Sequence, residues 1–201
     1  ELLGVKKESN VLAIPPMSVL KVPFSIASVS KETPLKSVDL NLHLKNKNNQ
    51  VVSNQVVKLE VKTKHQHHKK TFISAIDGSV QYYSVAPSTD KDSEAQALFL
   101  SVHGASVEAV NQANAYEKKD WGNVVAPTNR RPFGFAWEDW GRLDALEVLA
   151  DAKTIYQPDP SKIYLTGHSM GGHGTWYLGA TYPDKFASIA PCAGYPDLLL
   201  Y

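Results

Sequence analysis

The sequence predicts two regions, a small β-sandwich-like domain over residues 1–70 and an α/β domain with a mainly parallel sheet over residues 71–201. The first observation is a break in charge. The 201-residue chain has a net charge of +1, but residues 1–70 carry 12 lysines and 5 acidic residues, whereas residues 71–201 carry 9 basic and 15 acidic residues. The second is periodicity, which is two residues before the break and alternates between strand and helix patterns after it. The third is that Phe24 is the only aromatic residue before residue 71.

Short β-type segments fill the first region. Residues 38–45 alternate apolar and polar side chains, a polar turn follows at residues 46–50, and the alternation resumes over residues 57–62. Residues 11–14 and 17–26 are two further β-type runs, and prolines interrupt them as they do edge strands. Four or five short strands without a helix predict a small or incomplete sandwich with a lysine-rich face in solvent.

The second region alternates strands with helices, which is typical of a parallel α/β sheet. Asp77-Gly78 lies between two β-type runs and predicts a hairpin. In chain order we expect strands over residues 72–76, 79–85 and 97–102, a helix over 107–116, a strand over 122–126, a long amphipathic helix over 138–156, a strand over 162–166, a helix after residue 169 and a strand over 187–193.

Composition excludes several classes of protein. A hydrophobic content of 43% with 20% charged residues is that of a folded domain. The single cysteine, Cys192, excludes an internal disulfide and a multi-cysteine zinc site. No apolar run is long enough to span a bilayer. The lysines of the first region alternate with core positions and have no aromatic residues among them, so a solvated face is favoured over nucleic-acid binding.

Three histidines, His65, His67 and His68, lie in a lysine-rich stretch over residues 64–70. They could hold a metal ion, but no carboxylate or cysteine lies within that stretch. A polar linker between the two domains is therefore the favoured interpretation.

The sequence Gly167-His168-Ser169-Met170-Gly171 follows a predicted strand and precedes a predicted helix. This G-x-S-x-G pattern is the nucleophile elbow, a sharp turn that exposes a serine hydroxyl above the sheet. Glycines are needed on both sides because side chains there would collide where strand and helix cross. The start of the helix directs free N–H groups and a positive dipole end at the site. The alternative, a phosphate-binding loop, lacks the lysine of a P-loop.

In these features the chain resembles the α/β-hydrolase superfamily from about residue 72 to its end. The resemblance rests on the elbow, on the turn at residues 103–105 and on residues 182–194. The sub-groups it resembles most are prolyl-oligopeptidase-like peptidases and secreted bacterial esterases of the polyhydroxybutyrate-depolymerase or feruloyl-esterase kind. Such proteins often carry an N-terminal β-domain.

The resemblance implies roles for individual residues. Ser169 would be the nucleophile that attacks an ester or amide carbonyl. The backbone N–H groups of Met170 and Ala105 would form the oxyanion hole. His103 would shape the loop that holds Ala105 rather than act as a base. No metal or organic cofactor is implied.

The chain departs from the family in one respect. An α/β-hydrolase triad runs serine, acid, histidine along the chain, but the only histidine after Ser169 is His173, one helical turn further on, for which a packing role is expected. Asp184 is expected at the wrong end of the sheet, and Asp197 is a possible acid. We therefore expect residues 71–201 to be the N-terminal part of an α/β-hydrolase catalytic domain, cut short, with the triad acid and histidine beyond residue 201.

Other residues follow the strand over residues 122–126, at the end where ligands bind in α/β sheets. Arg130 and Arg131 are candidate substrate-binding residues that could hold a carboxylate. They could equally pair with nearby acids, and this structural role is favoured; the acids are Glu138, Asp139 and Asp144. An aromatic run lies in the same stretch and comprises Phe133, Phe135, Trp137 and Trp140. Three later residues are expected to be buried: Trp176, Tyr177 and Cys192.

The sequence therefore predicts a serine hydrolase that acts through an acyl-enzyme on a small-molecule ester or peptide. The alternative is a non-catalytic binding or scaffold module built on a hydrolase-like half-fold. We expect neither a nucleic-acid partner nor a membrane-spanning segment. The open sheet edge after Ala193 could pair with a second copy of the chain. The chain begins without an initiator methionine, so we expect a processed or cut product and a periplasmic or extracellular location.

Overall fold

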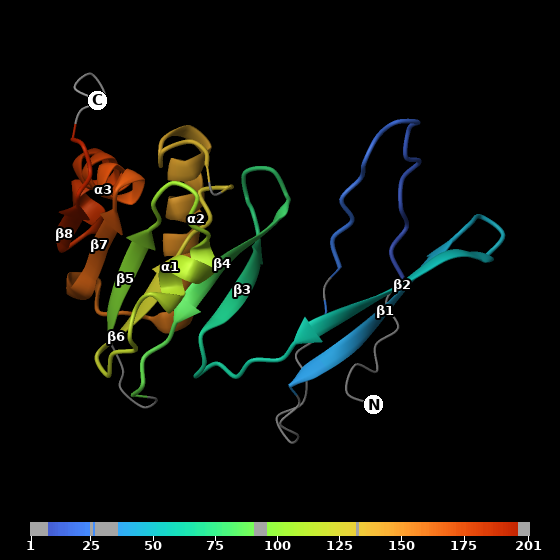
Figure 1. The fold of residues 1–201 in the computed structure, drawn as a ribbon, viewed down its shortest axis with the longest axis horizontal. Coiled ribbons are helices and arrows are strands. Elements are labelled where there is room, and N and C mark those ends of the chain that lie inside the picture. The colour runs from blue at the N-terminus through green and yellow to red at the C-terminus, as the bar shows by residue number, and fades with distance from the viewer. Residues whose placement is uncertain (1–7, 25, 27–35, 91–95, 132, 197–201) are drawn as a thin grey trace. The chain divides into compact units, whose positions relative to one another are not determined.

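The computed structural model describes residues 8–24, 26, 36–90, 96–131 and 133–196. The chain divides into two compact units, Glu1–Val61 and Lys62–Tyr201 (Figure 1). The second unit therefore includes residues 62–70, which the composition break assigns to the first domain. The predicted linker is also shorter than expected, because strand β3 begins at His68.

The first unit contains an antiparallel hairpin of β1 (Ser37–Lys45) and β2 (Val51–Glu60), in which Leu40 pairs with Val57. Its turn is held by Asn46, whose side-chain oxygen accepts hydrogen bonds from two backbone N–H groups further along the turn. The expected β-structure of this region is thus confirmed, but the described residues form one two-stranded sheet rather than the two layers of a sandwich. None of the described residues of this unit is buried.

The further strands expected over residues 11–14 and 17–26 are wrong for the part of them that the structure describes, which contains no strand. A turn occupies their centre instead. The hydroxyl of Ser18 donates to the carbonyl of Pro15, and Met17 has a left-handed φ of 60°. Two consecutive prolines supply no N–H group to a ladder, so local turn chemistry prevails over the β-type composition.

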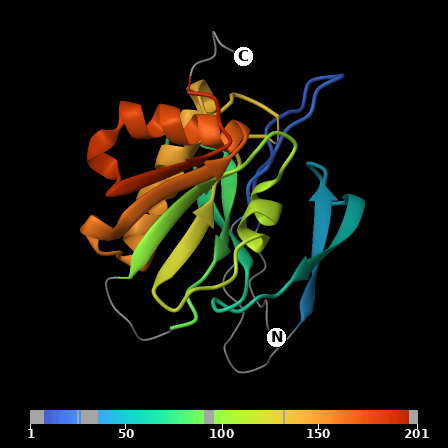
Figure 2. The same ribbon diagram turned by 60° about the vertical axis from the view of Figure 1, so that its left-hand side comes forward.

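The second unit is built on a six-stranded sheet with the order β3-β4-β6-β5-β7-β8 (Figures 1 and 2). Strands β5 to β8 are parallel, whereas β3 and β4 form an antiparallel hairpin that joins the sheet through β4 and β6. The strands are β3 (His68–Ile73), β4 (Val80–Ala86), β5 (Ala97–Val102), β6 (Gly122–Ala126), β7 (Ile163–His168) and β8 (Ser188–Cys192). The expected α/β sheet is confirmed.

Three helices cover this sheet: α1 (Ala109–Asn114), α2 (Asp139–Tyr156) and α3 (Met170–Thr181). Helices α2 and α3 pack on one face, where Leu100 and Leu165 from the strands meet Val148 and Leu178 from the helices. Helix α1 packs on the opposite face, against Ala126 and its neighbours. Two short 3-10 turns complete the order, η1 (Pro160–Lys162) and η2 (Pro183–Lys185).

Strand β8 is covered on one side only in the described part of the chain. Ile189 packs against Gly179 of α3, whereas Cys192 points to the other face and is exposed. The expectation that Cys192 is buried is therefore wrong, because no described element covers that face of β8. Trp176 is 42% exposed and so lies outside the core, whereas Tyr177 packs against the core.

The parallel arrangement brings the carboxyl ends of β5, β6, β7 and β8 to one edge of the sheet. The segments that leave these ends are residues 103–108, 127–138, 169–170 and 193–196. Ligands of α/β sheets bind at this edge. This edge therefore carries the candidate site.

Candidate active site

Ser169 lies between the last residue of β7 and the first residue of α3. Its backbone has φ 58° and ψ −120°, a conformation that costs a non-glycine residue of the order of 1–3 kcal/mol. The side chain is exposed, and no described group hydrogen-bonds its hydroxyl. The predicted strand-to-helix turn with an exposed serine is thus confirmed.

The flanking glycines are required by close backbone contacts. A Cβ atom on Gly167 would lie 2.4 Å from the carbonyl oxygen of Gly171, and a Cβ atom on Gly171 would lie 2.0 Å from the carbonyl oxygen of Val102. Both obstacles are backbone atoms that cannot turn away. The strand and the helix can therefore cross this tightly only with glycine at both positions, as the sequence pattern predicts.

The loop after β5 lies directly beside Ser169. A Cβ atom on Gly104 would be 3.6 Å from Cβ of Ser169. The loop turns through a hydrogen bond from the N–H of Val107 to the carbonyl of Gly104. In the described part of the chain no group accepts the N–H of Ala105 or of Met170, the first residue of α3. Both N–H groups are thus available next to the serine.

His103 holds this loop from below. Its ring is fully buried, and the ring nitrogens lie 3.0 Å from the carbonyl oxygen of Thr128 and 2.9 Å from that of Gly104. The indole N–H of Trp137 donates to the backbone carbonyl of His103 at 2.9 Å. The histidine thus joins the loop after β5 to the loop after β6. It has the shaping position expected of it.

Comparisons with known proteins agree with this geometry. The Esterase family model matches residues 106–199. Poly(3-hydroxyalkanoate) depolymerase C of Paucimonas lemoignei is 34% identical over 119 residues, which are 49% of this chain and 28% of that protein. Feruloyl esterase B of Talaromyces funiculosus is 27% identical over 139 residues, 62% of this chain and 39% of that protein. The matched regions span between 15% and 39% of the curated relatives.

Among solved structures, the chain is similar to the fluorophosphonate-binding serine hydrolase F of Staphylococcus aureus. The TM-score is 0.55 at 19% identity, and the match covers 64% of this chain and 57% of that one. With the strand order and the elbow, this likeness decides the fold. The larger unit has the α/β-hydrolase fold.

In the described residues of the second unit, no histidine hydrogen-bonds the Ser169 hydroxyl. His173, the only histidine after Ser169 in the sequence, is buried in α3. Its two ring nitrogens face Glu138 and the backbone carbonyl of Tyr195 instead. The expected packing role of His173 is confirmed. Asp184 lies in η2 before β8, at the sheet edge opposite the elbow, and Asp197 lies outside the described residues.

Arg130 is held within the protein by three carboxylates. Its guanidinium lies 3.0 Å from Glu147, 3.2 Å from Asp77 and 3.4 Å from Asp144, and its side chain is only 9% exposed. The contact with Asp144 matches the structural pairing that the sequence favours. The sequence did not indicate the contacts with Asp77 and Glu147. Arg130 also lines a pocket described below, and its role in substrate binding stays a prediction.

The charges around Arg130 differ in their surroundings. Burial raises the pKa of Asp144, although the neighbouring Arg130 and the hydrogen bonds from Thr128 oppose that rise. Hydrogen bonds from Ser79 lower the pKa of Asp77 from 3.8 to about 2. One guanidinium thus faces three carboxylates, of which Asp144 is fully buried and Asp77 is 34% exposed, and its loss would leave them without this counter-charge.

Arg131 is exposed, and its guanidinium lies over the ring of Phe135 at 4.9 Å. Its exposed guanidinium is accessible to a ligand, and its role in substrate binding also stays a prediction. The aromatic run divides in the structure. Phe133 is 65% exposed, whereas Trp137 is fully buried against Gly174 of α3. The sequence places Trp137 at the mouth of the site, and the structure corrects this because the loop turns inward there.

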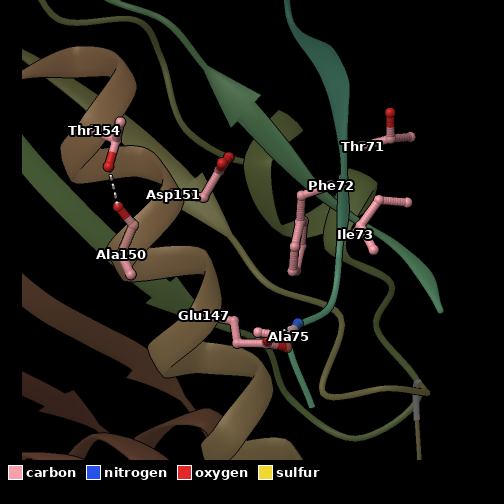
Figure 3. Close-up of a pocket in the computed structure, with 8 residues that line it drawn as sticks. All are labelled: Thr71, Phe72, Ile73, Ala75, Glu147, Ala150, Asp151 and Thr154. Carbon is pink, nitrogen blue, oxygen red and sulfur yellow. Dashed lines mark hydrogen bonds between the residues drawn. The ribbon is translucent and has the colours of Figure 1, made fainter. Parts of the chain in front are cut away.

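The described residues of the second unit line hollows in at least two places. A pocket of about 210 Å³ lies next to the loop after β5 and is lined by Gln81, Tyr82, Glu108, Ala109, Thr128, Arg130 and Arg131. A larger, open groove of about 510 Å³ separates β3 from α2. Figure 3 shows that one face of α2, with Glu147, Ala150, Asp151 and Thr154, lines its wall opposite Phe72 and Ile73. This groove lies at the β3 edge of the sheet, away from β7 and the elbow.

The described residues contain no group of three or more histidine, cysteine, aspartate or glutamate side chains that could hold a metal ion. None of the described helices is long and apolar enough to cross a membrane.

Proposed function

We propose that the hydrolase domain cleaves esters through an acyl-enzyme formed on Ser169. The observation that carries this proposal is the strained, exposed serine at the end of β7, beside a loop and a helix start with unused N–H groups. A strained backbone at an exposed polar residue is typical of a functional site. The match of residues 106–199 to the Esterase family model supports an ester as the substrate.

In the proposed reaction, the hydroxyl oxygen of Ser169 attacks the ester carbonyl carbon and passes its proton to a base. The carbonyl oxygen becomes an oxyanion, and the N–H groups of Met170 and Ala105 donate hydrogen bonds to it. The base then protonates the departing alcohol as the acyl-enzyme forms, and water releases the acid in the second half of the reaction. The positive end of α3 favours the same negative charge.

A serine hydroxyl needs such a base because it is weakly nucleophilic while it keeps its proton. No described histidine hydrogen-bonds the Ser169 hydroxyl, and the nitrogens of His173 are engaged elsewhere. We therefore expect residues 1–201 alone to react slowly at Ser169 and to react faster when free imidazole supplies the base.

The test is covalent labelling of the 201-residue chain with a fluorophosphonate, with and without imidazole, followed by peptide mass spectrometry. We expect phosphonylation at Ser169, faster with imidazole, and none in Ser169→Ala. His168→Gln is the matched control, because it changes the exposed neighbouring residue and leaves the hydroxyl in place. Labelling at another residue, or none at any imidazole concentration, contradicts the proposal.

A peptide substrate is the less supported alternative, since the family model and the curated relatives described above are named for esters or polyesters. A binding or scaffold role is favoured by one observation, the absence of a described base beside Ser169. That role predicts no labelling of Ser169 even with imidazole. A location outside the cytoplasm remains part of the proposal and agrees with the family resemblance.

A further inference from the structure

His173 connects three segments around the start of α3. Its backbone N–H donates to the carbonyl of Ser169 at 3.0 Å, which places it one helical turn after the elbow. Its ring is 4% exposed. It stacks on the ring of Tyr195, with 4.4 Å between the two centroids. A buried polar ring of this kind must find partners for both nitrogens.

Both ring nitrogens of His173 face oxygen atoms. Nδ1 lies 3.1 Å from the backbone carbonyl oxygen of Tyr195, and Nε2 lies 2.9 Å from Oε1 of Glu138. A carbonyl oxygen only accepts hydrogen bonds, so Nδ1 carries a hydrogen. A carboxylate also only accepts, so the contact between Nε2 and Oε1 is attractive only if a proton lies between them.

The segments joined in this way pack too closely to move independently. A Cβ atom on Gly194 would lie 2.1 Å from the backbone of Gly172, and one on Gly174 would lie 2.4 Å from the ring of Trp137. The residue 194–196 segment thus contacts one side of α3, and the residue 137–138 turn contacts another.

Both segments lead to the reactive serine. Cys192, at the end of β8, accepts a hydrogen bond from the N–H of Ser169 at 2.9 Å. Trp137 donates to the carbonyl of His103, which holds the oxyanion loop. A shift of either segment would therefore change the surroundings of the Ser169 hydroxyl.

We propose that His173 is a positioning residue. A proton held between its Nε2 and Oε1 of Glu138 fixes the residue 194–196 segment and the residue 137–138 turn against the start of α3. The proton and its structural effect stand on the geometry alone, while their effect on reactivity rests on the proposed function. The titratable groups that face the ring are Glu138 before α2, Tyr177 on α3 and Tyr195 after β8.

The proposal gives the site a dependence on pH. When the shared proton leaves, the neutral ring keeps only one N–H, so a nitrogen lone pair faces either the carboxylate oxygen of Glu138 or the carbonyl oxygen of Tyr195, and one of the two contacts becomes repulsive. We call the His173 ring with its contacts to Glu138 and Tyr195 the clamp. The clamp therefore holds at low pH and weakens as pH rises. In Glu138→Gln the amide N–H can donate to an unprotonated Nε2 while Nδ1 still donates to Tyr195. This substitution keeps every hydrogen bond without the extra proton, so the clamp should become independent of pH.

The first measurement is the protonation of the His173 ring in the 201-residue chain, read from its nitrogen chemical shifts by NMR. At about pH 6, within the range in which imidazole changes charge, we expect either two ring N–H groups or one N–H with a protonated Glu138 carboxyl. The carboxyl carbon shift of Glu138 separates these two forms. A single ring proton together with an ionised Glu138 overturns the proposal.

The second measurement compares urea unfolding midpoints of the wild type, Glu138→Gln and the control Glu117→Gln, whose side chain is exposed. Between about pH 5 and about pH 8, the wild type and Glu117→Gln should lose stability relative to Glu138→Gln, by about tenfold in the unfolding equilibrium. Parallel pH profiles for all three proteins overturn the proposal. Each comparison is internal to one pH, so other titrating groups cancel.

The third measurement is the rate of fluorophosphonate labelling at Ser169 with imidazole, over the same pH range. We expect the ratio of the wild-type rate to the Glu138→Gln rate to fall as pH rises and to remain constant for Glu117→Gln. A constant ratio for Glu138→Gln shows that the clamp does not position the site and so overturns the positioning role. A complete lack of labelling instead contradicts the proposed function, while the first two measurements still decide the clamp.

Discussion

Two hairpins in this protein have similar sequence patterns and different surroundings. In β1 and β2 every described residue is at least partly exposed, whereas the second half of β4, from Tyr83 to Ala86, is buried. Strand β4 pairs with β6 on one side and packs against the helix layer, while β1 and β2 pair only with each other. An alternating pattern therefore predicts a strand, but the neighbours of the strand decide how much of it is buried.

The difference in burial between the two units should have its largest effect on stability when an aromatic side chain is removed. Trp137→Ala should destabilise the second unit by about 3–5 kcal/mol, because removal of the indole leaves a cavity. The loss of the hydrogen bond to the carbonyl of His103 should add about 1 kcal/mol. Urea unfolding followed by far-UV circular dichroism measures this. Phe24→Ala in the first unit, where the ring is 45% exposed, is the matched control and should change stability by at most about 0.5 kcal/mol. Equal losses of stability in Trp137→Ala and Phe24→Ala would contradict the difference in burial between the two units.

Buried charge gives the second comparison. Arg130→Met should cost about 3–5 kcal/mol, because three carboxylates would lose the cation that they surround. Lys58→Met removes an exposed lysine of β2 and should change stability by no more than about 0.5 kcal/mol. Thermal unfolding of both variants and the wild type provides the measurement. A small effect of Arg130→Met would mean that water screens the cluster.

The smallest expected effect concerns acid. The pKa of Asp77 is lowered from 3.8 to about 2 in the folded protein, so its contribution to stability is present above pH 3.8 and is lost as pH falls toward 2. Asp77→Asn should remove this part of the acid sensitivity. Asp39→Asn, on exposed β1, should leave the acid-unfolding profile unchanged. The prediction is contradicted if the stability of Asp77→Asn falls as steeply as that of the wild type between pH 3.8 and about 2.

The elements that the sequence predicts best are those that the fold buries on both faces. Strands β5 and β6 have the expected bounds, because their continuous apolar runs end where the chain becomes polar or turns. Residues 11–14 have a similar composition but pair with no strand among the described residues, so the prediction of a strand there is wrong. Composition reports what a segment can bury, and only tertiary structure supplies the surface that buries it.

The elbow could be predicted because its requirement is local, with glycines and serine at fixed spacing on one crossing of strand and helix. Trp137 could not be placed in the same way. Its burial depends on a loop that turns inward through left-handed residues and on Gly174 of α3, far along the chain. The partners of His173 belong to the same class, since Glu138 and Tyr195 precede and follow it on separate segments. No nearby pattern marks such contacts.

The backbone of Ser169 also bears on why a serine occupies this position. Glycine adopts φ 58° and ψ −120° readily, so a Ser169→Gly protein would fold with less strain and should be more stable than the wild type. Random substitution under selection for stability alone would thus replace the serine. A serine at this turn is a residue that folding disfavours, which agrees with the reactive role proposed for its hydroxyl.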